Sequence, residues 1–201
     1  EGVADVIERL EQKPKAVFLF TVCLHHFLGS DLERIYDELG KRFPEICFVR
    51  CFMDPIMRKS GLTPDQKLRL SMYDPLKKGP VTEEGQRRIS ILGSDFALDE
   101  TSDLKRLLRC NDYQIKESPV CESWEDYLSL SDCRMMLNCY PSGKAGTEWA
   151  AERLGRPFMY MPSCFDYDEI IGQLEALSES MELLGVLDYE GEKESCEAAL
   201  H

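Results

Sequence analysis

Short apolar runs alternate along this chain with segments of helical periodicity, and no other feature constrains the fold as strongly. Predicted strands span 16–22, 46–52, 88–93, 113–116, 134–139 and 156–161. Predicted helices span 3–10, 30–40, 64–73, 101–109, 124–130, 143–154 and 166–184. Because strand–helix alternation of this spacing is typical of parallel sheets with right-handed crossovers, we predict an α/β fold of two Rossmann-like units.

A polar linker that contains Gly79-Pro80 separates the two sets of predicted elements. It places the first Rossmann-like unit at 1–85, the second at 86–186 and an acidic tail at 187–201. Lys193 is the only lysine or arginine of that tail. A solvated, charged segment is the simplest interpretation of the tail, and a docking surface for a redox partner is the alternative.

Composition and charge exclude several classes of protein. The chain has 201 residues, of which 43% are hydrophobic and 30% are charged, as in ordinary globular proteins. No apolar stretch approaches the ~18 residues of a membrane helix, and no secretory signal is visible. The net charge of −13 disfavours nucleic acid as a partner, because phosphate binding needs a basic footprint. The sequence begins with Glu1 rather than methionine, which suggests either processing or a piece of a longer protein, and we expect the latter.

The nine cysteines are odd in number, include no Cys-x-x-Cys pair and suggest no disulfide framework. Reduced thiols in a cytoplasmic protein fit this pattern better, and most of them are expected to be small buried hydrophobes. Cys47, Val49 and Cys51 share one face of their predicted strand. That spacing could hold a metal, although core packing is the commoner role of so buried a residue type.

One cysteine lies at the carboxyl end of the first predicted strand. Cys23 follows the apolar run 16–22, whose length and composition predict a strand buried on both faces. A loop and a helix follow, with Ser30 and Glu33 at capping-box spacing and Gly40 as the expected helix stop. Since ligands of open parallel sheets bind at the carboxyl ends of the strands, this thiol is well placed for chemistry.

A second cysteine, Cys139, ends the predicted strand 134–139 just before a helix. The partial positive charge of a helix start favours a thiolate there, and the alternative is an unreactive thiol at a strand end. Other chemical motifs are weak. The segment 142–145 lacks the first glycine of a phosphate loop, and neither a dinucleotide fingerprint nor a nucleophile elbow is present.

The stretch Cys23 to Leu32 resembles the Cys–x–x–x–x–Ile/Leu–Gly–Asp–Asp–Ile/Leu segment of the nitrogenase component 1 superfamily. This superfamily includes the molybdenum–iron protein subunits, cofactor-assembly scaffolds and dark-operative protochlorophyllide reductases. The order and spacing of further segments are similar to the family over roughly residues 15 to 184: the strand 89–93, the helix 103–108, and the stretches 138–142 and 154–158.

The resemblance implies a truncated nitrogenase component 1-like fold, with Cys23 as a ligand of an iron–sulfur cluster at a subunit interface. It also implies that Cys139 ligates one end of a buried active-site metallocluster. The implied partners are a homologous subunit, in a homo- or hetero-oligomer, and an ATP-driven iron–sulfur reductase that supplies electrons. An iron–sulfur cluster takes about four thiolates. The family's further ligands lie in regions that this chain lacks, so a partner or flanking sequence would have to complete the coordination.

Two functions remain open at this stage. The first is a nitrogenase-like oxidoreductase or cofactor-assembly scaffold domain that binds a metallocluster for electron transfer. The second is a binding or interaction module that keeps the fold without a cluster. Ser30 in place of the family's first aspartate and Pro141 in place of a basic residue favour the second. His25 and His26 come shortly after Cys23, with Leu24 between, but lack zinc spacing to a second cysteine.

Overall fold

The structure of the chain is a computed structural model that describes residues 2–53, 55 and 60–199. The predicted connection at 54–61 therefore lies largely outside the described residues. The first part of the chain contains α1 (Gly2–Arg9), β1 (Ala16–Val22), α2 (Leu24–Phe27), α3 (Leu32–Arg42), β2 (Cys47–Met53) and α4 (Pro64–Tyr73).

The second part contains more elements and begins with a 3₁₀ turn at Gly85–Arg87. It continues with β3 (Arg88–Ile91), α5 (Asp103–Cys110), β4 (Gln114–Glu117), a 3₁₀ turn (Ser118–Val120), α6 (Trp124–Leu128), a 3₁₀ turn (Ser129–Ser131), β5 (Met135–Asn138), α7 (Pro141–Leu154), β6 (Phe158–Tyr160), α8 (Tyr167–Met181) and α9 (Tyr189–Ala199).

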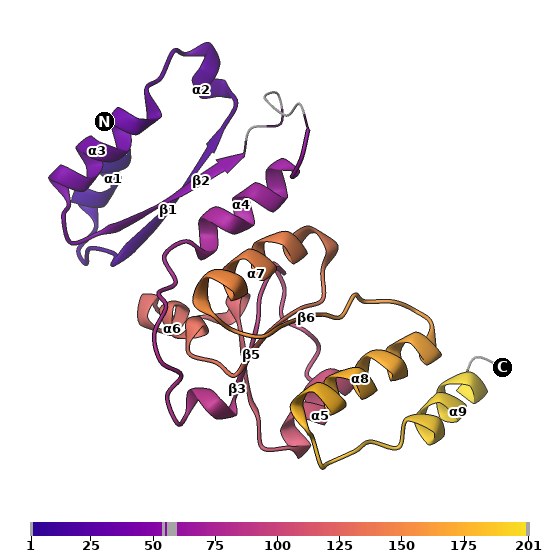
Figure 1. Cartoon of the computed structure of the whole chain (residues 1–201). Coiled ribbons are helices and arrows are strands. Elements are labelled where there is room, and N and C mark those ends of the chain that lie inside the picture. The colour runs from indigo at the N-terminus through magenta and orange to yellow at the C-terminus, as the bar shows by residue number, and fades with distance from the viewer. Residues whose placement is uncertain (1, 54, 56–59, 200–201) are drawn as a thin grey trace.

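The strands form two parallel sheets, one with the order β1–β2 and one with the order β4–β3–β5–β6 (Figure 1). Every pairing among them is parallel, so the α/β fold class predicted from the sequence is confirmed. In the two-stranded sheet the register runs from Ala16 opposite Cys47 to Val22 opposite Met53. The division of the chain at residue 85 into two units stays a prediction.

The four-stranded sheet is covered on both faces. On one face, Ile89, Leu137 and their neighbours pack against leucines of α5 and α8. On the other face, Leu92 and Met136 pack against α7 and the segment around α6. All four residues of β3 and all four of β5 are buried as a result. This sheet therefore holds the main core of the molecule.

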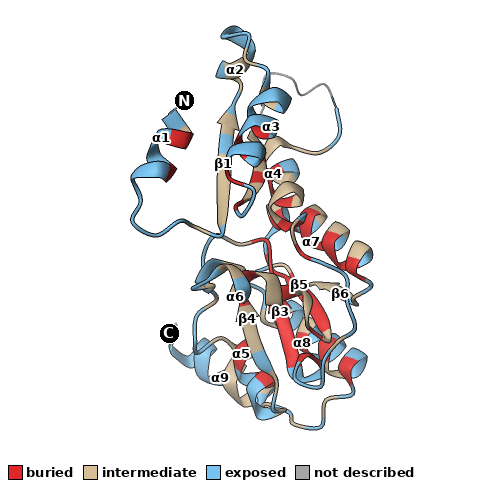
Figure 2. Cartoon of the chain, turned by 90° about the vertical axis from the view of Figure 1, so that its left-hand side faces the viewer, coloured by how far each residue is buried: buried red, intermediate tan, exposed pale blue. Residues whose placement is uncertain are grey.

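The two-stranded sheet is covered less completely. Helices α1 and α3 pack on one face through Ile7 and Leu39. On the other face α4 covers β2, with Leu68 against the buried residues Val49 and Cys51, so core packing is confirmed for these two strand positions. On the β1 half of that face, Phe18 meets Trp124 and Tyr127 edge-on, whereas Phe20 and Val22 are more than half exposed among the residues that the structure describes (Figure 2). The expectation that β1 is buried on both faces is therefore wrong, because too few elements surround it.

The segment between β1 and β2 differs from expectation at three points. A short helix, α2, occupies part of the expected loop. The N-cap of α3 is Asp31 rather than Ser30, and the Asp31 side chain accepts from the Arg34 amide over 3.1 Å. Helix α3 also continues through Gly40 to Arg42, and the buried Phe43 follows it.

Helix ends in the rest of the chain follow local chemistry more closely. Thr63 and Gln66 form a capping box at the start of α4, with bonds of 3.2 and 2.8 Å. Gly155 ends α7 in the left-handed conformation, which agrees with the predicted helix end at residue 154. The helix begins earlier than expected, because Pro141 is suited to its first turn. Helix α8 ends at Met181, three residues before the predicted end.

Helix α9 forms within the predicted acidic tail. Glu192 pairs with Arg106 of α5 at 2.6 Å, and Lys193 pairs with Asp168 of α8 at 2.6 Å. These contacts attach the segment to the helices of the four-stranded sheet. None of the helices in the described part of the chain is long and apolar enough to cross a membrane.

Candidate functional site

Cys23 lies immediately after β1 and is half-buried. Helix α2, four residues long, follows it, and Cys23 is its N-cap. The rings of His25 and His26 in this helix lie 3.9 Å apart. The Nδ1 atom of His25 lies 2.7 Å from the carbonyl oxygen of Val22. In the tautomer with the proton on Nδ1, the ring donates a hydrogen bond to that oxygen. The thiol is therefore held at the rim of the first sheet by a short, locally bonded turn.

Apolar side chains lie on both sides of Cys23 in the sequence and reach the surface. Val22, Leu24, Phe27 and Leu28 are each more than half exposed. Single exposed apolar residues are ordinary, but a patch of them indicates a surface where another molecule binds. Cys23 thus belongs to an exposed apolar patch rather than to a closed pocket.

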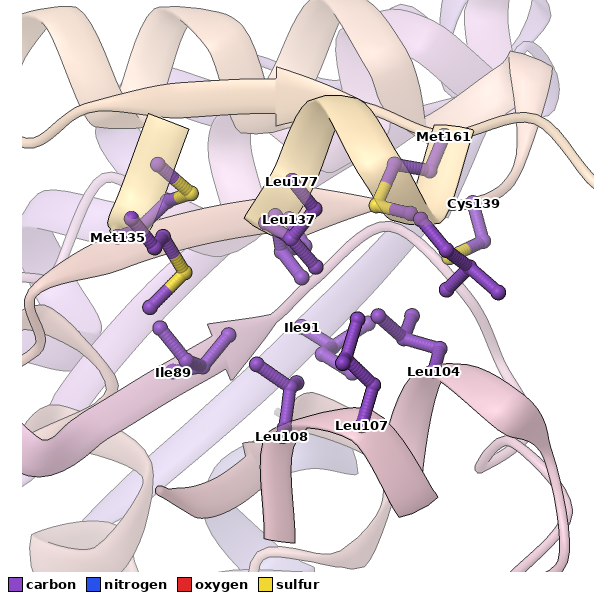
Figure 3. Packing of buried hydrophobic residues seen from close by; sticks show 12 residues of the cluster. Ile89, Ile91, Leu104, Leu107, Leu108, Met135, Leu137, Cys139, Met161 and Leu177 are labelled. Carbon is purple, nitrogen blue, oxygen red and sulfur yellow. The ribbon is translucent and has the colours of Figure 1, made fainter. Parts of the chain in front are cut away.

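Cys139 lies directly after β5, in very different surroundings. Its side chain is 5% exposed and packs in the apolar cluster between the sheet and helices α5 and α8. Figure 3 shows its sulfur close to Met161 and Leu104. The side chains that pack around the thiol in this cluster are apolar.

A cavity of about 210 Å³ opens next to Cys139. Its wall carries a second thiol, Cys164, which sequence reasoning did not single out although it follows β6 at the same edge of the sheet. The Gln173 side-chain amide lies 3.9 Å from the Cys164 sulfur, and most of the remaining wall is apolar. The cavity therefore presents two sulfur atoms in mainly apolar surroundings.

Burial raises the pKa of the Cys139 thiol to about 11, and the nearby carboxylate of Glu117 adds to the shift. Helix α7 begins two residues later, and the partial positive charge of its start opposes this shift. The cost of desolvating a charged sulfur in this packing outweighs the attraction of the helix start. The thiol of the chain on its own is therefore protonated at neutral pH.

A buried ion pair lies beside this cavity. Lys105 of α5 pairs with Glu117 at the end of β4, and their side chains are only 2% and 6% exposed. Lys105 donates to the Leu98 carbonyl over 2.8 Å, and Glu117 accepts from the Leu98 amide over 2.7 Å. The pair thus fixes the loop that contributes Leu98 to the cavity wall. No local sequence pattern marks it, because only the folded sheet brings the two residues together.

The two predicted ligands follow strands of different sheets. Cys23 follows β1, and Cys139 follows β5. Across residues 2–53, 55 and 60–199, no group of three or more His, Cys, Asp or Glu side chains is arranged to hold a metal ion. The assignment of Cys23 and Cys139 as ligands stays a prediction.

Comparison with solved structures identifies the fold. A chain of nitrogenase Cp1 at pH 6.5 superposes with a TM-score of 0.70 and 15% sequence identity, over 96% of this chain and 46% of that one. A chain of nitrogenase Cp1 at pH 5 superposes with a TM-score of 0.61 and 14% identity, over 90% of this chain and 36% of that one. No protein-family model matches the sequence, and no curated protein is significantly similar to it.

The chain therefore has a nitrogenase component 1-like fold, as the sequence resemblance implies, and the identity of about one residue in seven shows the fold alone. The chain spans less than half the length of these nitrogenase chains. Cluster binding, electron transfer and partners are not shown by the likeness.

Proposed function

We propose that this domain supplies Cys23 as one ligand of a metal cluster shared with a partner chain, within a nitrogenase-like oxidoreductase or cofactor-assembly scaffold. The observation that carries the proposal is the position of Cys23, at the carboxyl end of β1 and next to exposed apolar side chains. A partner chain that covered this patch would exclude water from the thiolate and bring further ligands to it.

The donor set of this chain fits part of such a site. An iron–sulfur cluster takes about four thiolates, whereas the turn that follows β1 contains one, Cys23. His25 and His26 lie in the same turn and supply nitrogen atoms only. A cluster at this place would therefore be completed by sulfur ligands from another chain or from sequence that flanks this one.

Cys139 is the second proposed ligand, and its role differs. The cavity beside it holds two thiols, Cys139 and Cys164, in mainly apolar surroundings. A metal bound there would have to displace thiol protons, since metals bind thiolates. When bound, such a group supplies electron-transfer chemistry, and the chain's own residues hold the group and shield it from water. An ATP-dependent iron–sulfur reductase is the proposed electron donor.

Iron content tests the proposal. The protein purified anaerobically with its native partner is expected to be brown and to contain iron. Cys23→Ala is expected to lose most of that iron, whereas Cys110→Ala, which removes an exposed thiol on α5, is expected to keep it. Unchanged iron content in both Cys23→Ala and Cys139→Ala would refute the proposal.

The burial of Cys139 favours a second candidate function, a cluster-free interaction module with the same fold. Its thiol is protonated and enclosed by apolar side chains, which is how a structural cysteine behaves. On this alternative the apolar patch around Cys23 binds a partner without any metal. A colourless, iron-free protein that still binds its native partner would support this alternative over the first.

A further inference from the structure

The outer edge of β1 pairs with no other strand among the residues that the structure describes. The Cys47 amide donates to the Lys15 carbonyl over 2.9 Å. In a parallel pair every second residue bonds to the neighbouring strand, so Lys15 and each second residue after it point their backbone groups toward β2. The amides and carbonyls of Phe18 and Phe20 consequently point away from β2. No strand in the described part of the chain pairs with them. Such a row of backbone donors and acceptors is a template for another strand.

The other sheet edges carry features that discourage pairing. The outer edge of β2 carries Arg50, whose guanidinium lies 4.8 Å from the Tyr36 ring centroid. In the four-stranded sheet, the edge strand β4 contains Lys116 and the edge strand β6 is three residues long. Charged side chains and short length both protect edges. The β1 residues whose backbone groups point outward are every second residue from Ala16 to Val22, and all of them are apolar.

A groove of about 450 Å³ lies along this edge, between β1 and the segment that contains α6. Its floor is an aromatic cluster in which Trp124 and Tyr127 stack with their ring planes 9° apart and Phe18 meets both edge-on. The Tyr127 hydroxyl donates to the Met72 carbonyl over 2.6 Å, which fixes the ring. The groove therefore combines a fixed apolar floor with unpaired strand backbone.

Around the start of β1 the two lysines already have partners, whereas one carboxylate of the groove lacks a cation among the described residues. Lys15 pairs with Glu125. Lys13 folds back on α1, where it donates to three carbonyl groups over 2.6, 2.9 and 3.2 Å. Glu122 lines the groove, and its carboxylate forms no ion pair with the residues that the structure describes. A cationic side chain of an occupant would complement it.

We propose that this edge and groove bind an extended, basic segment of another protein by β-strand addition. The backbone of the segment pairs with Phe18 and Phe20, and its alternate apolar side chains lie on the aromatic floor. A lysine or arginine at the end near Lys15 pairs with Glu122. The surface needs no metal, so this proposal stands or falls separately from the cluster at Cys23.

Charge selects a basic partner over a second copy of this chain. Each copy carries a net charge of −13, so two copies repel each other, whereas a basic segment is attracted to the same surface. Locally, self-pairing of β1 would also leave Glu122 without a cation. Both arguments favour a different chain as the occupant.

A synthetic peptide provides the probe. It carries two lysines followed by alternating valine and threonine, with a fluorescent label. Fluorescence anisotropy with the 201-residue chain is expected to show saturable binding that weakens as salt is added, because the pair with Glu122 is solvent-exposed. The same peptide with every second backbone amide N-methylated is expected to bind at least about tenfold more weakly, since those amides can no longer donate to β1.

Variants of the chain locate the binding. Phe20→Lys puts a charge on the edge without changing the β1–β2 ladder and is expected to weaken binding at least about tenfold. Phe165→Lys, at a fully exposed phenylalanine before α8, is the matched control and is expected to bind as the wild type does. Glu122→Gln is expected to weaken binding of the lysine peptide but not of a version with threonine in place of the lysines.

Several results would overturn the proposal. The first is that the N-methylated peptide binds as tightly as the unmodified one. The second is that Phe20→Lys, with a circular dichroism spectrum like that of the wild type, binds the peptide as tightly as the wild type does. The third is that the unmodified peptide does not bind at all. A concentration-dependent dimer in sedimentation, abolished by Phe20→Lys, would replace the basic partner with a second copy of this chain.

Discussion

The two sheets of this molecule differ in how far their surroundings complete them. The four-stranded sheet has helices on both faces, and its central strands β3 and β5 are buried throughout. The two-stranded sheet has an open edge, and Phe20 of β1 is 56% exposed. Hydrophobicity alone does not explain this difference, because β1 is apolar except for Thr21, whereas the buried β3 contains Arg88 and Ser90.

The comparison shows that a strand is buried by its neighbours rather than by its own composition. Both strands were predicted from the same kind of pattern, a short apolar run followed by a helical segment. In the fold, however, β3 lies between two other strands, whereas β1 lies beside one. We therefore expect substitutions in the four-stranded sheet to affect the stability of the chain. We expect substitutions at the open edge of β1 to affect binding instead.

The largest expected effect is the loss of the buried cation in the four-stranded part. Lys105→Met leaves the Glu117 carboxylate buried without its partner, which costs about 3–5 kcal/mol. Urea unfolding followed by circular dichroism measures this loss. The double substitution Lys105→Met with Glu117→Leu is expected to recover most of it, since no buried charge remains.

An exposed ion pair beside the two-stranded sheet is the control. Arg42 and Glu8 join α3 to α1 at 3.0 Å, with both side chains about half exposed. Arg42→Ala is expected to change the free energy of unfolding by less than about 1 kcal/mol. If Arg42→Ala lowered the free energy of unfolding as much as Lys105→Met does, the two parts would not differ in how strongly their ion pairs stabilise the chain.

The next effect compares one apolar side chain from each sheet. Leu137→Ala in β5 removes a fully buried side chain and is expected to cost about 3 kcal/mol. Phe20→Ser in β1 removes a mostly exposed ring and is expected to cost less than about 0.5 kcal/mol in the chain alone. Denaturant titration of both variants checks this, and a large loss in Phe20→Ser would show that β1 is covered in solution.

Local chemistry made most of the fold predictable. Strand positions and parallel pairing follow from short apolar runs that alternate with helical segments. The ends of α4 and α7 follow from Thr63 and Gly155, whose roles depend only on neighbours in the sequence. Predictions failed where tertiary contacts decide: α3 continues through Gly40 because Leu39 and Phe43 are buried on either side of it.

The candidate site was predictable in position but not in environment. Cys23 and Cys139 follow the strands that the sequence indicates. The sequence could not show that apolar packing encloses Cys139, or that Cys164 shares its cavity, because helices distant in the sequence build those walls. The Lys105–Glu117 pair was missed for the same reason.

The pH dependence of stability at alkaline pH shows how far water is excluded from buried thiols in each part of the molecule. Burial raises the pKa of Cys51, on the face beneath α4, to about 11 from 9.0, and it raises the pKa of Cys121, in the loop before α6, to a similar value. Between pH about 9 and about 11 the unfolded chain has therefore lost thiol protons that the folded chain keeps. Unfolding releases protons there, so the free energy of unfolding falls as pH rises through that range.

The expected fall is roughly 2–3 kcal/mol for each thiol, from about 1.4 kcal/mol per pKa unit. Urea unfolding at a series of pH values measures it. Cys51→Ala and Cys121→Ala are each expected to flatten the alkaline fall by a similar amount. A smaller change in Cys51→Ala would mean that water reaches the face beneath α4, and the first sheet would then be more open than the structure shows.

The smallest expected effects come from two helical glycines that differ in their surroundings. A Cβ atom added to Gly143 in α7 would lie 2.3 Å from the backbone of Gly93, so Gly143→Ala is expected to cost about 1–3 kcal/mol. A Cβ atom on Gly40 in α3 would meet nothing within 4 Å, so Gly40→Ala is expected to stabilise the chain by about 0.5–1 kcal/mol. Thermal unfolding of both variants measures whether each substitution lowers or raises the stability of the chain. If Gly40→Ala were destabilising, α3 would be packed against more than the described residues, and the first sheet would not be the open part of the molecule.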